Sequence, residues 1–536
     1  MSAAAVETPG RLESLLTDSA TRWPDRVALE DPATGERVTY GELDERSTRY
    51  ARALAERGVR RGDRVGLAVP KSIDSVAWIF GILKAGAAYV PVDPDAPAAR
   101  SRGIFVDCSV AAIVAATSVA GSLEADEDSP WLEGTAFGPN VVLLTGGADD
   151  EEPASATRGG GTLAYILYTS GSTGAPKGVM HSHASARAFV DWCSETFEPN
   201  EDDRFSSHAP FHFDLSIFDL YVAIKHGAGI VLIGEDSGKS PLQLAEIAAD
   251  RGITFWYSTP TVLRLMLEYG RMEGRDYGDL RMVFFAGEVF PIGQLRRLRR
   301  LWSEPRFFNL YGPTETNVCT WYEVGPHIPD DRIEPVPIGR PASGDLCRVV
   351  DPDGAPVPAG DEGELVVSGG SVMLGYWGRP ERTAASTLVD DDGVSWYRTG
   401  DIVREDEAGD YVFLGRRDRM VKRRGYRVEL GEIESALYRH PDIVEAGVVA
   451  TSDDESGVAI TAFLAWAGDG SPSAIMLKRH CAGNLPAYMV PDAFIAVESL
   501  PKTSTDKIDY QRLERDVGVP GRGSDAPVGA QRRESG

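Results

Sequence analysis

The sequence has few cysteines, no long apolar run and fewer basic than acidic residues. Its five cysteines lie far apart among 536 residues and include no C-x-x-C pair, which argues against a disulfide framework and against a zinc site. No apolar run approaches the length that spans a bilayer, and the first residues lack the basic and apolar segments of a secretory signal. We therefore expect a cytoplasmic protein without a membrane partner.

The charge balance excludes one further class of partner. The chain has 55 Lys and Arg residues against 81 Asp and Glu residues, which gives a net charge of −26. Such a surface repels the phosphates of nucleic acids, so we expect no nucleic-acid partner. With 42% hydrophobic and 25% charged residues over 536 positions, the chain is expected to form at least two globular domains with a large core.

Apolar, β-rich runs alternate with helix-like segments along most of the chain. Runs typical of strands are residues 64–70, 228–234 and 281–287, and residues 240–252 are typical of a helix. This alternation predicts an α/β fold in which sheets and helices form layers. Residues 147–161 are rich in glycine and charge and predict a loop before the next strand.

The most informative run is YTSGSTGAPKG, from Tyr168 to Gly178. Its glycines can bare backbone N–H groups at little cost, its hydroxyl side chains add donors, and Lys177 adds a positive charge. These features suit a polyphosphate, although a Walker A loop is excluded because Gly178 stands where that motif has Ser or Thr. The candidate phosphate-binding residues are Thr169, Ser170, Gly171, Ser172, Thr173, Gly174 and Lys177.

Composition alone supports a flexible surface loop equally well at this place. The strand-like residues 163–168 lead directly into the run, and this favours the phosphate site. Further motifs accompany it along the chain. They are TYGEL (39–43), LKAGAAYVPVDP (83–94), NLYGPTET (309–316), GELVVSGGSVMLGYW (363–377), YRTGD (397–401), GRRDRMVKRRGYRVELGEIE (415–434) and PKTSTDKID (501–509).

Together these motifs resemble the core motifs of the adenylate-forming superfamily, and in particular of its amino-acid-activating branch. The resemblance covers nearly the whole chain. It implies a large multi-layered N-terminal domain of β-sheets and helices that binds ATP and the amino acid, followed by a small mobile α+β domain that carries the catalytic lysine. The expected bounds are 1–417 for the first domain, 418–516 for the second and 517–536 for a disordered tail.

The resemblance also implies a hinge between the two domains. Asp418 matches the hinge position, and Lys422 and Gly425 match the loop that lines the pantetheine tunnel when the carrier is loaded. The catalytic lysine and this loop cannot occupy one site at the same time. The small domain is therefore expected to rotate between the two steps, with a few residues absorbing the change in backbone angles.

Roles in binding ATP and Mg²⁺ follow from the same resemblance. Asn309 and Tyr311 would hold adenine by an amide hydrogen bond and by stacking, Asp401 would accept both ribose hydroxyls, and Glu315 would ligate Mg²⁺. Taken singly, Tyr311 could be a core residue, Asp401 a turn residue and Glu315 a surface charge. The other implied ATP-binding residues are Gly287, Gly312, Thr314 and Arg416.

Lys507 is the main catalytic candidate, and Glu315 is the second. Lys507 occupies the place of the family's C-terminal lysine, which bridges the substrate carboxylate and the α-phosphate during adenylate formation. A charge placed where the transition state gains it is worth about 2.7–4 kcal/mol. The alternative is an ordinary solvated lysine, and Thr505 and Asp506 replace the Asn-Gly pair that usually precedes the family's lysine.

Asp214 indicates an amino acid as the substrate. It matches the aspartate that binds the α-ammonium group in the amino-acid-activating branch, where a charge-assisted hydrogen bond contributes about 1.5–3 kcal/mol. Two alternatives stay open: Asp214 could cap the following turn, and an acyl-CoA synthetase would be favoured if Asp214 did not face the substrate. Asp219 follows it closely in the sequence.

The remaining pocket positions are carried across by their offset from the motifs. They are Leu215, Phe218, Tyr257, Phe284, Ala286, Leu310, Val318 and Cys319. This lining has no charge apart from Asp214 and Lys507, so a charged substrate side chain would lose its hydration unpaired. Three aromatic rings leave a flat space that suits proline, and the set resembles the pockets of stand-alone L-proline-adenylating enzymes that start pyrrole formation in antibiotic biosynthesis.

No phosphopantetheine attachment motif is visible, so the acyl acceptor is expected to be a separate, phosphopantetheinylated peptidyl carrier protein. The expected function is ATP-dependent activation of an amino acid, with L-proline favoured, followed by transfer to that carrier. Another small apolar amino acid remains an alternative. A non-catalytic nucleotide-binding regulator is disfavoured because the chain has Lys177, Glu315, Asp401 and Lys507 together.

Overall fold

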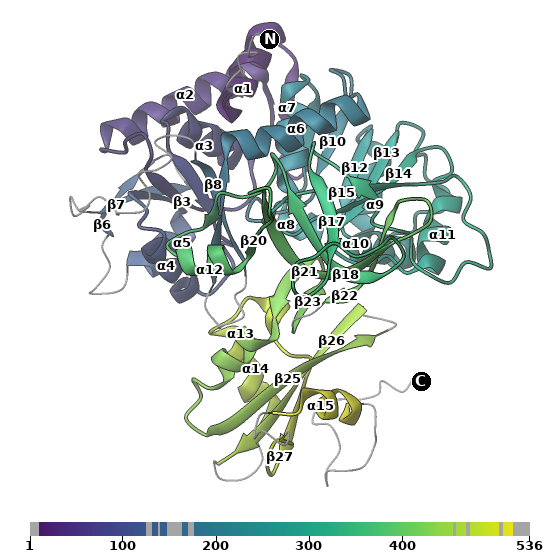
Figure 1. Cartoon of the computed structure of the whole chain (residues 1–536). Coiled ribbons are helices and arrows are strands. Elements are labelled where there is room, and N and C mark those ends of the chain that lie inside the picture. The colour runs from purple at the N-terminus through teal and green to yellow at the C-terminus, as the bar shows by residue number, and fades with distance from the viewer. Residues whose placement is uncertain are drawn as a thin grey trace, which may run out of the picture. The chain divides into compact units, whose positions relative to one another are not determined.

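The computed structural model describes residues 10–124, 131–137, 140–146, 163–169, 176–416, 419–453, 457–467, 472–502 and 508–517. Within these residues the chain divides into two compact units (Figure 1). The first unit comprises Met1–Pro94, Gly103–Tyr168 and Gly178–Arg417, and the second comprises Asp95–Arg102, Thr169–Lys177 and Asp418–Gly536. The predicted hinge, the predicted loop at 147–161 and nearly all of the predicted tail lie outside the described residues.

A nine-stranded sheet forms one half of the first unit. Its central strands, from β14 to β1, are parallel and largely buried, as expected for strands that helices cover on both faces. In spatial order the strands are β16 (Arg340–Pro341), β15 (Thr320–Val324), β14 (Arg306–Tyr311), β13 (Met282–Ala286), β12 (Phe255–Ser258), β10 (Arg204–Ser207), β11 (Gly229–Leu232), β1 (Val27–Glu30) and β2 (Arg37–Thr39).

Two further sheets complete the first unit. The eight-stranded sheet contains β19 (Gly375–Tyr376), β9 (Lys177–Ser182), β8 (Leu163–Thr169), β4 (Ala88–Pro91), β3 (Arg64–Ala68), β5 (Ala112–Ala116), β7 (Val141–Gly146) and β6 (Trp131–Ala136). The five-stranded sheet contains β17 (Leu346–Val350), β18 (Glu362–Ser368), β21 (Ser395–Glu405), β20 (Thr387–Val389) and β22 (Tyr411–Arg416).

Helices lie between and around these sheets, and local sequence explains where several of them begin. Thr39 and Glu42 form a capping box at α2, and Ser182 and Ser185 form one at α6. The helices are α1 (Leu12–Arg22), α2 (Tyr40–Glu56), α3 (Ile73–Lys84), α4 (Ala98–Asp107), α5 (Thr117–Glu124), α6 (His183–Phe197), η2 (Phe218–Val222), α7 (Ala223–Lys225), α8 (Glu235–Gly238), α9 (Pro241–Asp250), α10 (Pro260–Tyr269), α11 (Ile292–Leu301) and α12 (Pro380–Ala385).

One hydrophobic core joins the two large sheets. It contains residues of both, such as Phe205 and Tyr165, together with apolar side chains of α3, α6 and η2. The helix α3 is buried over most of its length because its sequence is apolar on nearly every face. Within the part of the chain that the structure describes, no helix is both long enough and apolar enough to cross a bilayer.

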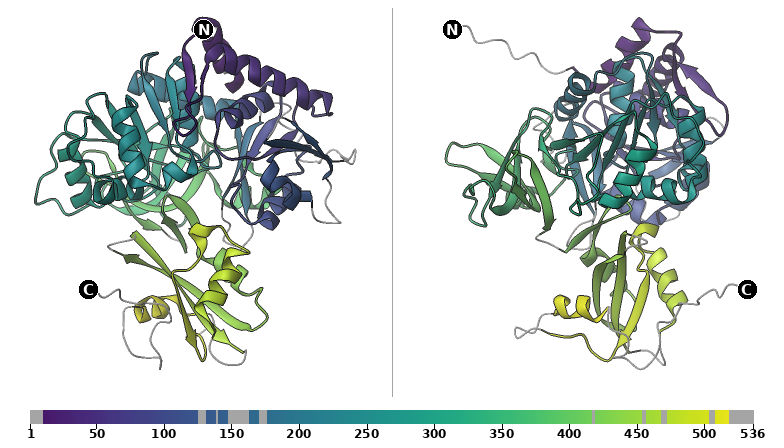
Figure 2. Two further views of the ribbon diagram at one scale, coloured as in Figure 1. Left: turned by 180° about the vertical axis from the view of Figure 1, so that it is seen from behind. Right: turned by 90° about the vertical axis from the view of Figure 1, so that its right-hand side faces the viewer.

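The second unit has a small α+β core of its own (Figure 2). Its elements are β23 (Met420–Arg423), β24 (Tyr426–Glu429), α13 (Leu430–Leu437), β25 (Ile443–Asp453), β26 (Gly457–Trp466), α14 (Ala474–Ala482), η3 (Ala487–Met489), β27 (Ala493–Val497) and α15 (Tyr510–Asp516). Neighbouring residues of β25 belong to different clusters, Val448 with α13 and α14 and Val449 with α15. Because side chains alternate along a strand, helices cover both faces of this sheet.

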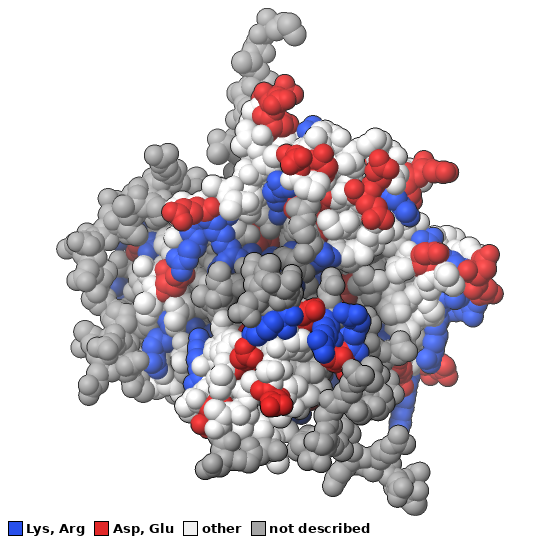
Figure 3. Space-filling view, turned by 60° about the horizontal axis from the view of Figure 1, so that its bottom comes forward, with Lys and Arg blue, Asp and Glu red and all other residues white. Residues whose placement is uncertain are grey.

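These observations confirm the predicted fold class, an α/β protein with a large N-terminal and a small C-terminal domain. The predicted strands at 64–70, 228–234 and 281–287 contain β3, β11 and β13, and the predicted helix at 240–252 contains α9. On the face in Figure 3, acidic and basic side chains are interspersed in small groups. The acidic excess therefore does not form one continuous patch on that face.

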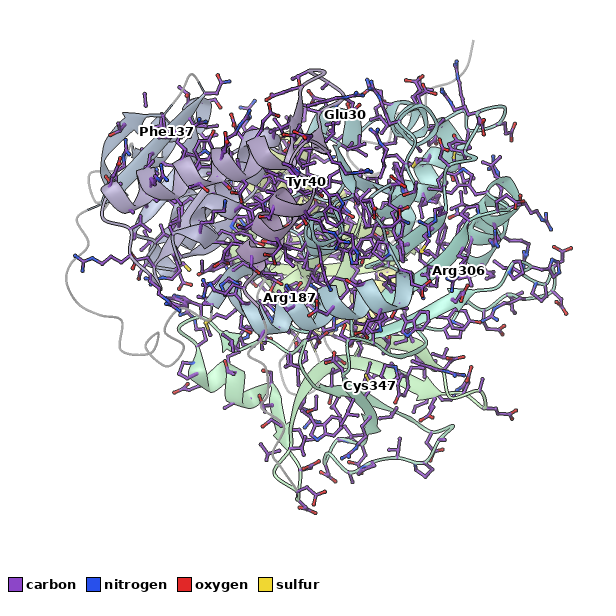
Figure 4. The ribbon with its side chains drawn as sticks, turned by 90° about the horizontal axis from the view of Figure 1, so that it is seen from above. Glu30, Tyr40, Phe137, Arg187, Arg306 and Cys347 are labelled. Carbon is purple, nitrogen blue, oxygen red and sulfur yellow. The ribbon has the colours of Figure 1, made fainter. Side chains whose placement is uncertain are left out.

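Glu30, a buried acid labelled in Figure 4, lies at the end of β1 and pairs with three arginines. The carboxylate of Glu30, with 3% of its side chain exposed, bonds Arg204 at 2.7 Å and Arg251 at 2.8 Å, and Arg37 lies 3.0 Å away. Burial alone would raise the pKa of Glu30, but the hydrogen bonds and charges of Arg204 and Arg37 outweigh it and lower that pKa. Glu30 therefore holds together segments that are about two hundred residues apart in the sequence.

Replacing Glu30→Gln should lower the free energy of unfolding at pH 7 by about 1–3 kcal/mol, because three guanidinium groups lose their shared anion. The pKa of Glu30 is lowered on folding, so its stabilisation is present above the ordinary value of 4.5 and is lost as pH falls through the lowered value. Urea denaturation followed by tryptophan fluorescence between pH 7 and about pH 3 tests both points.

The matched control is Glu323→Gln. Glu323 pairs with Arg306 through two bonds of 2.8 and 2.9 Å, but both side chains are about half exposed. An exposed pair contributes less than about 1 kcal/mol. Equal losses in the two variants would contradict the role assigned to Glu30.

Candidate functional site

The carboxyl ends of β12, β13 and β14 bring several predicted site residues together. In the parallel register Tyr257 pairs with Phe284, and Ala286 pairs with Leu310. Side chains that end neighbouring parallel strands gather at one edge of a sheet, which is where ligands bind in open α/β sheets. This edge lies within the first unit.

Three predicted aromatic residues meet at this edge. The ring centre of Phe218 lies 4.8 Å from that of Phe284 and 5.4 Å from that of Tyr257, and Tyr257 and Phe284 are 6.1 Å apart. The three come from separate segments of the chain, so their contact is a product of the tertiary structure. Phe284 also stacks on Phe308 at 5.3 Å and is fully buried, so it serves the core as well.

The other predicted pocket residues divide between two hydrophobic clusters. Leu215, Ala286, Leu310 and Val318 belong to the same cluster as the three aromatic rings. Cys319 belongs instead to a cluster around Tyr311, and its carbonyl oxygen accepts a hydrogen bond from Cys347 Sγ at 3.6 Å.

Asp214 is half-buried and starts the turn that leads into η2. Its carbonyl oxygen accepts a hydrogen bond from the N–H of Ile217 at 3.0 Å. Burial, and after it the charge of Asp214, raises the pKa of Tyr257 well above its ordinary value. Burial, and after it the charges of Tyr89 and Asp214, also raise the pKa of Tyr165 well above its ordinary value. The charge of Asp214 therefore acts on Tyr257 at the sheet edge and on Tyr165 in β8.

Asp219 is a second acid of the same segment, and its environment differs. Both of its carboxylate oxygens are buried and have no hydrogen-bond partner among the residues that the structure describes. Burial raises the pKa of Asp219 well above its ordinary value, and the charge of Lys71 only partly opposes this. Burial also lowers the pKa of Lys71 to about 7. Burial thus favours the protonated form of the Asp219 carboxyl group, which its position in the sequence did not reveal.

Three of the predicted nucleotide-binding residues form one hydrogen-bonded group. Asp401 pairs with Arg416 in the register of β21 and β22, and Arg416 Nη1 donates to Asp401 Oδ1 at 2.6 Å. The hydroxyl of Tyr311 donates to the other oxygen of Asp401. Burial and then the charge of Asp401 raise the pKa of Tyr311 well above its ordinary value, so this hydroxyl stays a donor.

The turn after β14 carries the other predicted residues of the nucleotide site. The side-chain amide of Asn309 donates to the carbonyl oxygen of Pro337 at 2.8 Å, which fixes its orientation. A Cβ atom at Gly312 would lie 1.8 Å from the carbonyl oxygen of Asn317, so only glycine permits this turn. Gly287, directly after β13, has φ of 91°.

Glu315 is fully buried within that turn. The hydroxyl of Tyr376 donates to Glu315 Oε1 at 2.7 Å, and the N–H of Met373 donates to its carbonyl oxygen at 2.8 Å. A buried carboxylate bonded by a neutral hydroxyl fits the hard oxygen donor that Mg²⁺ requires. Tyr376 lies in the matched motif at 363–377, but nothing in the sequence indicated that it would contact Glu315.

His181 also reaches this turn and was missed by the sequence analysis. Its Nε2 lies 2.8 Å from the carbonyl oxygen of Thr314, its Nδ1 lies 3.1 Å from Ser185 Oγ, and its ring stacks on Tyr165. Burial lowers its pKa to about 4, which keeps the imidazole neutral. The sequence does contain one indication of this role. His181 lies four residues after Lys177, so the two side chains project from the same face of a strand.

Some of the remaining predicted site residues lie in parts of the chain that the structure describes, and the others do not. Thr169 ends β8, and Lys177 begins β9 with 4% of its surface exposed. Lys422 lies in β23, and Gly425 has φ of 80° in the turn to β24. The predicted residues that lie outside the described ones are Ser170, Gly171, Ser172, Thr173, Gly174, Asp418 and Lys507.

Two family models match this chain. The family model described as AMP-binding enzyme matches residues 16–377, and the model described as AMP-binding enzyme C-terminal domain matches residues 432–507.

Two curated relatives carry the same description, L-proline–[L-prolyl-carrier protein] ligase. One, from Pseudomonas fluorescens, is 40% identical over 94% of this chain and 99% of its own length. The other, from Streptomyces coelicolor, is 39% identical over 97% of this chain and 100% of its own length. Among solved structures, the amide bond synthetase McbA from Marinactinospora thermotolerans superposes with a TM-score of 0.81 at 25% identity, covering 94% of this chain and 99% of that one.

Replacing Asp401→Asn should weaken the binding of AMP roughly ten- to hundredfold, the equivalent of about 1.5–3 kcal/mol for charge-assisted hydrogen bonds. The amide cannot accept from two neighbouring donors as a carboxylate does, and Arg416 loses its anion. Isothermal titration with AMP measures the effect. Asp410→Asn is the control, since Asp410 pairs with the exposed Arg340, and AMP affinity unchanged in both variants would contradict the prediction.

Proposed function

We propose, from the premise that this chain belongs to the AMP-binding enzyme family, that it activates L-proline with ATP and transfers the prolyl group to a separate carrier protein. The observation that carries this proposal is the 40% identity to a relative described as L-proline–[L-prolyl-carrier protein] ligase, over 94% of this chain. The chain is a ligase, and the proposal concerns its substrate and acceptor.

The first step joins the amino acid to AMP. A carboxylate oxygen of proline attacks the α-phosphorus of ATP, the bond to the β-phosphate oxygen breaks, and pyrophosphate leaves. The second step transfers the acyl group. The thiol of a phosphopantetheinylated peptidyl carrier protein attacks the acyl carbon, loses its proton and releases AMP.

The site at the sheet edge suits a small apolar amino acid. Asp214 would pair with the ammonium group of proline, and Phe218 and Tyr257 would enclose the ring. Apart from Asp214 and Lys507 the predicted lining residues are uncharged, so a charged substrate side chain would lose its hydration unpaired. Another small apolar amino acid is the second candidate, which the same lining supports.

The nucleotide residues have matching roles in this proposal. Asp401 would accept the ribose hydroxyls, Tyr311 would lie against adenine, and Arg416 keeps the carboxylate of Asp401 oriented. Glu315 would hold Mg²⁺, which when bound neutralises charge on the phosphates. Thr169 and Lys177 flank the phosphate run. Lys507 would bridge the carboxylate and the α-phosphate, and this assignment rests on its motif alone. A cytoplasmic location is part of the same proposal.

L-Proline should drive ATP–pyrophosphate exchange far better than the other proteinogenic amino acids, because the lining is uncharged and closely packed around Asp214. Pipecolate should work more weakly, since one extra methylene in a pocket is worth about 1–3 kcal/mol. A radiolabelled exchange screen across free amino acids and fatty acids measures this. Strong exchange with a fatty acid and none with any amino acid would contradict the proposal and would instead support an acyl-CoA synthetase.

Replacing Lys507→Ala should slow formation of prolyl-AMP roughly a hundred- to thousandfold. Transfer from preformed prolyl-AMP to the carrier should stay near the wild-type rate, because the lysine serves only the first step. Lys502→Ala is the matched control, since Lys502 pairs with Glu445 in the same unit, and it should leave both steps unchanged. Equal loss of both steps in Lys507→Ala would mean that the lysine is structural.

A further inference from the structure

The imidazole of His181 connects a strand to the turn that carries Glu315. Its Nε2 lies 2.8 Å from the carbonyl oxygen of Thr314, 133 residues away in the sequence. A carbonyl oxygen only accepts, so the proton of the neutral ring is on Nε2 and donates to Thr314. The other nitrogen, Nδ1, then accepts from the hydroxyl of Ser185 at 3.1 Å.

The surroundings hold this ring in one orientation. His181 is 1% exposed, and its ring stacks on that of Tyr165 with centres 5.1 Å apart and planes 26° apart. Ser185 belongs to the capping box that begins α6, so its hydroxyl is itself held by the helix end. The Nε2 donor is therefore presented to Thr314 by a rigid strand and a rigid helix end.

A second strand approaches the same turn from the adjacent position. β19 pairs with β9 so that Gly375 lies opposite Met180 and Tyr376 opposite Val179. The hydroxyl of Tyr376 bonds the Glu315 side chain at 2.7 Å, while His181 bonds the backbone of the residue before it. Two neighbouring strands thus hold the backbone and the side chain of the turn separately.

We propose that His181 is a positioning residue that holds the turn bearing Thr314 and Glu315 in the arrangement needed to bind MgATP. The inference rests on the proposed function for the identity of the nucleotide site. His181 does not touch the reacting atoms in this proposal. It acts through the part-buried Thr314 carbonyl, and without the bond this oxygen would lose its imidazole partner and the turn would shift away from its bonded position.

The test compares two variants of His181 with a matched variant of His183. His181→Phe keeps a ring that can stack on Tyr165 but loses the donor, and His181→Gln places an amide N–H near the former Nε2. His183→Phe is the control, because His183 is also buried but accepts from the N–H of Leu12 in α1 and does not contact the turn. Each full-length variant is titrated with MgATP by calorimetry, and its melting temperature is measured without nucleotide.

We expect His181→Phe to weaken MgATP binding at least about tenfold and His181→Gln to return to within about threefold of wild type. His183→Phe should lower the melting temperature with MgATP affinity unchanged. In exchange assays His181→Phe should raise KM for ATP and leave KM for the amino acid unchanged. Unchanged MgATP affinity in His181→Phe, equal weakening in His183→Phe, or failure of His181→Gln to recover affinity would each overturn the proposal.

Two further points keep the test decisive. If His181→Phe does not fold, Ser185→Ala replaces it, because that variant removes the hydroxyl partner of Nδ1. Ser185→Ala should weaken MgATP binding by about threefold. Unchanged affinity would overturn the proposal.

If wild-type protein binds MgATP but no amino acid supports exchange, the proposed function fails. The role of His181 is then still decided by the MgATP titrations.

Discussion

The parallel register of β12, β13 and β14 is the constraint on which the rest of the site depends. It aligns Tyr257 with Phe284 and Ala286 with Leu310, so the chain leaves all three strands at one edge of the sheet. The turn after β14 then begins at a defined place. A slip of one residue would reverse the faces of every side chain along a strand and bury the wrong set.

Long-range polar contacts hold that turn and the nucleotide residues in place. Tyr311 and Asp401 are 90 residues apart, and Tyr376 and Glu315 are 61 apart, yet each pair is hydrogen-bonded in a buried setting. Buried polar groups are costly when unpaired and stabilising when fully bonded. The site is therefore rigid at its nucleotide residues, while its amino-acid side is formed mainly by packed rings and by the half-buried Asp214.

The sequence predicted many residues of the candidate site but not all of the side chains that pack against them. Tyr257 and Phe284 were placed by motif offset and do meet Phe218, because strand register follows from apolar pattern and the motifs lie at strand ends. Cys319 was placed in the same pocket but packs in the cluster around Tyr311. Cys319 directly precedes β15, and its backbone N–H donates to the carbonyl oxygen of Tyr311 at 2.9 Å, a contact that an offset from a motif does not report.

By itself the sequence determined the fold class, the order of the motifs, the adenylate-forming family and the residue types that the chemistry requires, because these depend on patterns among neighbours in the chain. Only the tertiary structure decided that His181 contacts Thr314, that Tyr376 bonds Glu315 and that Asp219 is a buried acid whose pKa is raised. The physical reason is that hydrogen-bond partners and burial are set by which strands and helices pack together, and a side chain's own segment carries no record of what will lie against it.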